Sequence, residues 1–113
     1  MDQNTVLLFT HYGLGDAPED LRLTLVVKFL TLLQEADTLP AKILFYTDGV
    51  KLACQGSPVL FLLKTFEAEG VELILCKTCL DYFNLAEKVE AGIVGGMPDI
   101  IEAMSRAPKL ISL

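Results

Sequence analysis

The stretch TVLLFTHYGLGDAPEDLRLTLVVKFLTLLQE, residues 5–35, carries three successive signals of an α/β fold. Its first six residues form a β-branched and apolar run, which is typical of a strand buried on both faces of a sheet. The Gly-rich loop HYGLGDAP follows, and residues 19–35 then have the composition and spacing of a helix. The stretch therefore predicts the opening strand, loop and helix of a βαβ unit.

The rest of the chain repeats this alternation. Four more strand-like runs are KILFYT (42–47), VELILC (71–76), AGIVGG (91–96) and KLISL (109–113), and further helices are indicated at 57–69, near 78–88 and at 98–106. Ser57 before Pro58 indicates one helix start, and Pro98 indicates another. Strands and helices that alternate in this way form right-handed crossovers and a parallel sheet covered on both faces. We predict a single α/β domain over residues 1–113, a three-layer sandwich with a five-stranded, mainly parallel sheet.

Composition limits the possible partners and surroundings. The net charge is −6 and no basic run occurs, which argues against binding to nucleic acid, because phosphate backbones are bound by clustered Lys and Arg. The first residues lack a secretory signal pattern, and Lys28 and Thr31 interrupt the longest apolar stretch, so we expect no membrane span. Three cysteines, an odd number, favour reduced thiols over a disulfide framework. We therefore expect a cytoplasmic protein.

The first helix is apolar on more than one side. Its large apolar residues spread over roughly 240° of the helix circumference, whereas a surface helix needs only about 100°. Two interpretations stay open: the sheet and neighbouring helices cover both sides, or one side forms an interface between subunits. A hydrophobic residue content of 52%, slightly above the usual share, also hints at such an interface.

The segment CKTC, residues 76–79, places two cysteines at the carboxyl end of a predicted strand. Open α/β sheets bind ligands at this edge. Free N–H groups at a helix start, together with Lys77, would favour a thiolate there, whereas Asp81 would oppose it. Thr78 is the expected N-cap of that helix, in an imperfect capping box with Asp81.

Four interpretations of Cys76 and Cys79 compete. Zinc requires four ligands, and only Cys54 and His11 stand beside the pair, so we predict no metal. A thioredoxin-like redox pair would lie earlier in its domain. The remaining interpretations are two buried, inert thiols and a thiolate that accepts sulfane sulfur as a persulfide.

Other residues offer weaker signals. His11 follows the first strand at the same sheet edge, so it is a candidate general base or hydrogen-bond partner of the thiolate, or simply a loop residue. Cys54 is either a second sulfur-carrying thiol or an incidental cysteine. For Gly49, in the turn-like Asp48-Gly49, we expect a positive φ.

Short motifs in a consistent order resemble the DsrE/DsrF-like family of small sulfur-relay proteins, most closely the DsrE-like C-terminal domain of YedF-type proteins associated with selenium metabolism. The motifs are GLGD (13–16), DGVKL (48–52), GSPVL (56–60), GVELILC (70–76), TCLDYF (78–83) and VGGMPDI (94–100). The resemblance implies that Cys76 is the sulfur acceptor and that Cys79 matches the second cysteine of a CGTC-type subgroup. This chain departs from that subgroup at Lys77, where Gly is usual.

The resemblance also implies a DsrE/flavodoxin-like fold, a homotrimer or hexamer, and sulfur-donor and sulfur-acceptor proteins as partners. On this basis we expect a sulfurtransferase or sulfur carrier that uses Cys76 and Cys79, supported by His11, Lys77 and Thr78, and that needs no organic cofactor. The alternative is a non-catalytic oligomeric binding or regulatory module of the same fold with inert cysteines.

Overall fold

The sheet has five strands, and all of them run parallel. The computed structural model describes residues 1–113. The strands lie in the order β4-β3-β2-β1-β5, and each neighbouring pair is parallel. Their bounds are β1 Thr5–Phe9, β2 Lys42–Phe45, β3 Glu72–Cys76, β4 Ile93–Gly95 and β5 Lys109–Ser112. The five predicted strands are confirmed, and each begins and ends within two residues of its predicted bounds.

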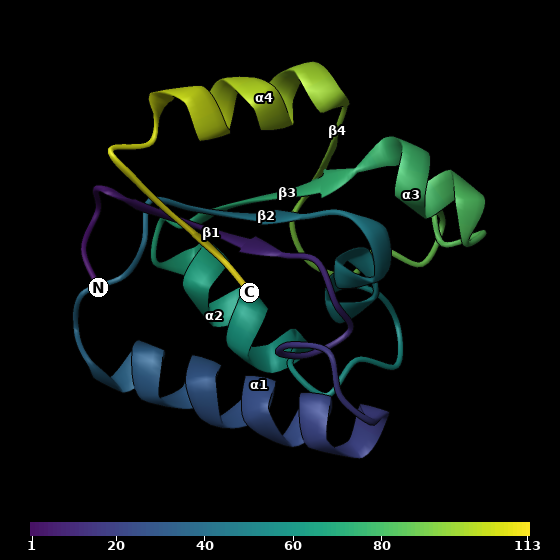
Figure 1. Ribbon diagram of the computed structural model, residues 1–113, viewed down its shortest axis with the longest axis horizontal. Coiled ribbons are helices and arrows are strands. Elements are labelled where there is room, and N and C mark those ends of the chain that lie inside the picture. Colours follow the sequence, from purple (N-terminus) through teal and green to yellow (C-terminus); the bar gives the residue numbers. More distant parts are fainter.

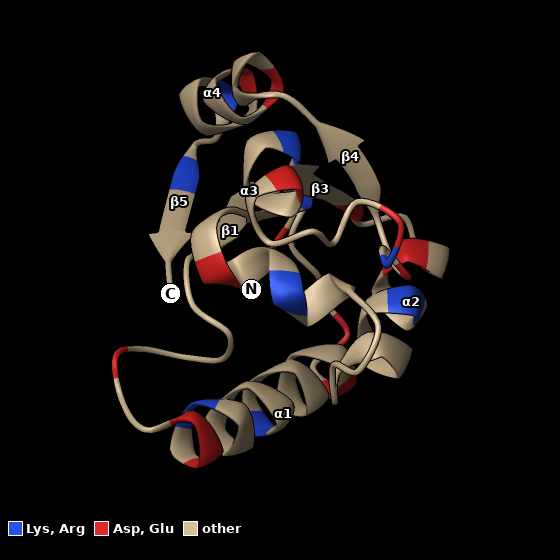
Figure 2. Ribbon diagram, turned by 90° about the vertical axis from the view of Figure 1, so that its right-hand side faces the viewer, with Lys and Arg blue, Asp and Glu red and all other residues tan.

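Helices cover both faces of this sheet. Helices α1 (Glu19–Glu35) and α2 (Leu60–Ala68) lie below it in Figure 1, and α4 (Met97–Arg106) lies above it. The predicted three-layer α/β sandwich is therefore confirmed. The short helix α3 (Lys77–Tyr82) projects from the carboxyl edge of the sheet. Figure 2 faces this edge, with α3 between α4 above and α1 below.

The core lies between the sheet and its helices. All five residues of β1 are buried, as expected for a central strand of a parallel sheet. Phe9 of β1 and Phe45 of β2 stack with ring centroids 5.7 Å apart. Below the sheet, α1 contributes Val26, Leu30 and Leu33 to the core. None of the helices combines the length and apolarity that crossing a bilayer requires.

Two helices begin or end elsewhere than predicted. Helix α2 begins at Leu60 rather than at residue 57, because the Ser57 Oγ accepts the Val59 N–H at 3.2 Å in a turn that precedes the helix. Helix α3 begins at Lys77 directly after β3, so Cys76 and not Thr78 is its N-cap, without a side-chain capping bond. It ends at Tyr82, and Asn84 soon after has a φ of 57°, so the helix does not extend to residue 88.

A 3₁₀ helix that the sequence did not predict follows β2. This helix, η1, spans Thr47–Ala53, with Gly49 buried inside it. The expectation of a positive φ at Gly49 is wrong, because the φ of this residue is not positive. Glycine is required here for another reason: a Cβ at this position would lie 2.0 Å from the Phe9 carbonyl oxygen. The close approach of η1 to β1 therefore leaves no room for a side chain.

One apolar side of α1 remains in solvent. Leu21, Leu25 and Leu32 are 49%, 39% and 65% exposed. On an α-helix these three positions fall on one stripe. Within a single chain, therefore, the sheet and neighbouring helices cover only one side of α1. The interpretation that the sheet and neighbouring helices cover both sides of α1 within one subunit is therefore wrong.

Candidate functional site

Three neighbouring strands end at the same edge and bring their next residues together. β1 leads to Thr10 and His11, β2 leads to Thr47, and β3 leads to the cysteine pair. Because parallel strands share a carboxyl edge, residues far apart in the sequence meet there. Two hydrogen bonds of Thr47, to Thr10 and to Cys79, join these three segments.

Cys76 and Cys79 differ in their access to solvent. Cys76 is the last residue of β3 and is only 1% exposed. Cys79, in the first turn of α3, is half-buried. The two thiols are close enough for Cys76 to raise the pKa of Cys79, and neither forms a disulfide. Of the pair, Cys79 is the sulfur that a reagent from solution reaches first.

The Cys79 thiol receives a backbone hydrogen bond from another element. The Thr47 N–H donates to the Cys79 Sγ at 3.0 Å. The pKa of Cys79 is nevertheless raised above that of an ordinary thiol. Burial is the largest cause, and the neighbouring Cys76 and Asp48 add to it, whereas the Thr47 N–H lowers the pKa. The predicted stabilised thiolate is therefore not found at Cys79 in the isolated chain.

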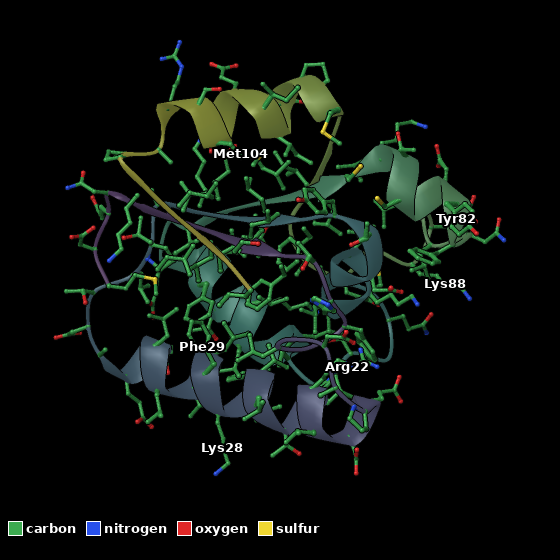
Figure 3. The ribbon with its side chains drawn as sticks, viewed as in Figure 1. Arg22, Lys28, Phe29, Tyr82, Lys88 and Met104 are labelled. Atoms are coloured by element: carbon green, nitrogen blue, oxygen red, sulfur yellow. The ribbon has the colours of Figure 1, made fainter.

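Lys77 and Thr78 do not support the pair as predicted. The Lys77 Nζ lies 2.6 Å from the Asp81 Oδ2, one helical turn away on the exposed side of α3. Its charge is thus already paired and does not offset the burial of Cys79. Thr78 is exposed in the first turn and does not cap the helix. At the outer end of α3, Tyr82 points away from the sheet and is 81% exposed (Figure 3).

His11 is linked to the pair only through other residues. Its Nδ1 lies 2.9 Å from the Thr10 Oγ1. The Thr10 carbonyl oxygen accepts a hydrogen bond from the Thr47 hydroxyl at 2.6 Å, and Thr47 in turn contacts Cys79. A direct bond between His11 and either thiol is not part of this arrangement. The role of His11 as a base acting on the thiol therefore stays a prediction.

Cys54 has a separate setting at the end of η1. It is 1% exposed, and its Sγ lies 3.2 Å from the Val50 carbonyl oxygen, to which it donates. Burial raises the pKa of this thiol. These properties suit a small apolar core residue better than a reactive one.

The arrangement of side chains does not form a metal centre. No three side chains of His, Cys, Asp or Glu converge as a ligand set would. Lys51 interacts with a carboxylate and an aromatic ring: its Nζ lies 2.6 Å from the Asp48 Oδ1 and 4.3 Å from the centre of the Phe83 ring. Phe83 and Lys51 line a cavity of about 400 Å³ together with Tyr12, Cys54, Gln55 and Leu85.

Thr47 is the site residue that the sequence did not indicate. Its position at the end of a predicted strand was a usable signal, because that end shares an edge with the cysteines. The contact of its N–H with Cys79 was not predictable, since the residue has a φ of 49° that threonine rarely adopts.

Comparison with known proteins matches both the sequence and the fold. The model of the DsrE/DsrF-like family matches residues 5–113. No match was found among curated proteins. Among solved structures, the YchN protein of E. coli is 18% identical with a TM-score of 0.70, and the match covers 100% of both chains.

Two proteins of unknown function share the same fold. MTH1491 of Methanobacterium thermoautotrophicum is 15% identical with a TM-score of 0.66, and the match covers 96% of this chain and 97% of that one. BT1422 of Bacteroides thetaiotaomicron is 15% identical with a TM-score of 0.67, and the match covers 97% of this chain and 95% of that one. At such low identity these likenesses establish the architecture and not an activity.

Proposed function

The chain belongs to the DsrE/DsrF-like family, which is generally linked to sulfur relay, and from that premise we propose that it carries sulfane sulfur as a persulfide on the Cys76–Cys79 pair. The observation that carries this proposal is the closeness of one buried and one half-buried thiol at the carboxyl edge of the sheet. Two neighbouring thiols allow sulfur to pass between them without leaving the protein.

The difference in exposure gives the two cysteines different roles. Cys79 receives sulfur from the donor protein, because Cys76 is 1% exposed and meets no large reagent directly. Cys76, which the family resemblance identifies as the acceptor, then holds the sulfur where burial excludes water. The raised pKa of Cys79 means that its thiol is mostly protonated at neutral pH, so we expect loading to speed up as the pH rises.

Each transfer is a thiol exchange that balances without a cofactor. The Cys79 thiolate attacks the terminal sulfur of the donor persulfide, the donor S–S bond breaks, and the donor leaves as a thiolate. Transfer to Cys76 repeats this exchange: the Cys76 thiolate attacks the terminal sulfur and Cys79 is released. The reverse exchange returns the sulfur to Cys79, where an acceptor thiolate attacks the terminal sulfur and releases the Cys79 thiolate. One S–S bond forms for each that breaks, so no oxidant or reductant is consumed.

Mapping sulfur onto individual cysteines tests these roles. Cleavage after Lys51, Lys64, Lys77 and Lys88 places Cys54, Cys76 and Cys79 on three separate tryptic peptides. After treatment with polysulfide, or with a cysteine desulfurase and cysteine, persulfides are alkylated and identified by mass. We expect adducts on Cys76 and Cys79, and in Cys79→Ser a rate of Cys76 loading at least about tenfold lower.

The controls separate the carrier from its alternative. Cys54→Ser should load like the wild type, and Cys76→Ser should still accept sulfur on Cys79. Absence of sulfur from all three peptides would reject the carrier function. That result would favour a non-catalytic oligomeric binding module of the same fold, which the burial of Cys76 and the raised pKa of Cys79 also suit.

The exposed stripe of α1 supports a homo-oligomer. Leu21, Leu25 and Leu32 lie on one exposed stripe that has no partner in the single chain, and Lys28 is the charged residue on it. Figure 2 shows that few charged residues interrupt the body of this helix. A second copy of the chain is the proposed partner on this surface, in a trimer or hexamer, alongside the sulfur-donor and sulfur-acceptor proteins. The cytoplasm is the proposed location, because relay chemistry needs thiols that stay reduced.

A further inference from the structure

Thr47 has a backbone conformation that its residue type disfavours. Its φ of 49° lies in the left-handed region. The other two non-glycine residues with positive φ are Asp37 and Asn84, which belong to the residue types that tolerate this conformation. A β-branched residue there is strained. Thr47 is also exposed, so core packing does not explain why the conformation is kept.

The hydroxyl of Thr47 holds the residue in place. Its Oγ1 lies 2.6 Å from the Thr10 carbonyl oxygen and 2.7 Å from the Tyr46 carbonyl oxygen. The hydroxyl therefore donates to the chain just beyond β1 or just beyond β2. Thr10 is itself fixed, since its own hydroxyl donates to the Leu113 carbonyl at 2.8 Å. The anchor of Thr47 is thus tied to the ends of three strands.

The strained conformation aims one polar group at the cysteine pair. With φ at 49°, the Thr47 N–H reaches the Cys79 Sγ at 3.0 Å. The same φ sets the angle between this N–H and the side chain, whose hydroxyl reaches the Thr10 carbonyl oxygen, so the two contacts are made together. An N–H that donates to sulfur favours the thiolate over the thiol, because it interacts more strongly with a full negative charge.

We propose that Thr47 is a positioning residue of the sulfur site: its hydroxyl anchor maintains the left-handed backbone that directs its N–H to the Cys79 sulfur. This inference rests on the proposed function, in which Cys79 must form a thiolate to accept sulfur and again when it releases sulfur. The threonine side chain acts through its own backbone and does not itself touch the transferred atom.

Other groups around Cys79 do not replace this hydrogen bond. Cys76 and Asp48 both disfavour the thiolate. The nearby cations are paired with carboxylates: Lys77 with Asp81, and Lys51 with Asp48, each at 2.6 Å. The Thr47 N–H is therefore the contact that offsets part of the burial of Cys79.

The pH dependence of Cys79 alkylation tests the inference. The rate is measured from about pH 7 to pH 10 on the peptide of residues 78–88, which contains Cys79 as its only cysteine. Thr47→Val keeps the β-branched shape and loses the hydroxyl. We expect it to lower the rate near neutral pH about three- to tenfold and to move the profile to higher pH. Thr47→Ser, which keeps the hydroxyl, should stay within about twofold of the wild type.

A control on the same scaffold excludes a general effect of losing a hydroxyl. Thr24 is an exposed residue of α1 whose hydroxyl also donates to a backbone carbonyl, that of Asp20, at 2.8 Å. Thr24→Val should leave the Cys79 profile unchanged. A wild-type profile in Thr47→Val, or an equal change in Thr47→Ser, would overturn the inference.

Two further measurements make the result decisive. If Thr47→Val does not fold, Thr47→Gly replaces it: glycine adopts a positive φ without strain but has no anchor, and a wild-type profile would overturn the role of the hydroxyl. Sulfur loading is measured separately. If Cys79 never loads sulfur yet its profile shifts in Thr47→Val, the relay function fails while the positioning of the thiol stands.

Discussion

At the scale of single residues, burial decides how each cysteine behaves. The sequence correctly placed Cys76 and Cys79 at the carboxyl edge, because a strand signal runs directly into the pair. It did not predict the raised pKa of Cys79, since the burial of this thiol and the nearby charge of Asp48, about 30 residues away along the chain, arise only in the folded chain. For the same reason the sequence did not show that the Lys77 ammonium pairs with the Asp81 carboxylate instead of stabilising a thiolate of the cysteine pair.

The buried thiol of Cys54 predicts a loss of stability at alkaline pH. Its pKa is raised in the folded chain, whereas the unfolded thiol ionises near pH 8.5. Between these two values the unfolded state binds fewer protons, so the free energy of unfolding falls as pH rises. The contribution is fully present below about pH 8.5 and is lost as the pH rises through the folded pKa.

Urea unfolding at about pH 7.5 and pH 9.5, under reducing conditions, measures this effect. In Cys54→Ala the decrease between the two pH values should be smaller than in the wild type. Val50→Ala is the matched control, since Val50 is fully buried and does not titrate. It should lower stability at both pH values and keep the wild-type decrease. An unchanged pH dependence in Cys54→Ala would contradict the prediction.

At the scale of elements, periodicity located the regular helices, and tertiary contacts set the irregular ones. Helix α1 has the predicted bounds, residues 19–35, because its length and apolar pattern leave little choice. η1 was missed, since its seven residues carry no periodic signal and Asp48-Gly49 resembles an isolated turn. Gly49 is explained by the carbonyl of Phe9, a contact between segments 40 residues apart that no local pattern contains.

Gly49→Ala should therefore damage the element that carries Thr47. The new methyl group would meet the Phe9 carbonyl oxygen at 2.0 Å, and backbone cannot move aside as a flexible side chain would. We expect a loss of about 2 to 3 kcal/mol in the free energy of unfolding, as in overpacked cores. Gly56→Ala is the control: its φ of 94° makes alanine strained, but nothing lies within 4 Å of the added methyl.

Urea denaturation of both variants separates contact from strain. Gly56→Ala should lose about 1 kcal/mol, the usual cost of a left-handed alanine. Displacement of η1 in Gly49→Ala should also weaken the hydrogen bond from Thr47 to Cys79, so Cys79 alkylation near neutral pH should slow. Equal losses of stability in the two variants would show that the approach of η1 to β1 does not require glycine.

At the scale of the whole molecule, the five-stranded parallel sheet and its three layers were predictable because every strand is flanked by helix signals of suitable length. The strand order and the complete parallelism follow from crossover rules together with contacts between distant strands. The sequence left one global question open, whether the chain itself covers both sides of α1. The exposed stripe answers it for the single chain and makes self-association the main prediction at this scale.

Leu32→Glu tests the proposed oligomer. Leu32 is 65% exposed, so glutamate at this position remains solvated in the monomer and should leave the fold intact. At an interface between subunits the same charge would be buried without a partner, which is strongly unfavourable.

We expect light scattering coupled to size exclusion to give the mass of a trimer or hexamer for the wild type and a smaller mass for Leu32→Glu. Thr24→Glu adds a charge to the same helix outside the stripe and should keep the wild-type mass. A monomeric wild type, or equal masses for the two variants, would exclude the stripe as the subunit interface.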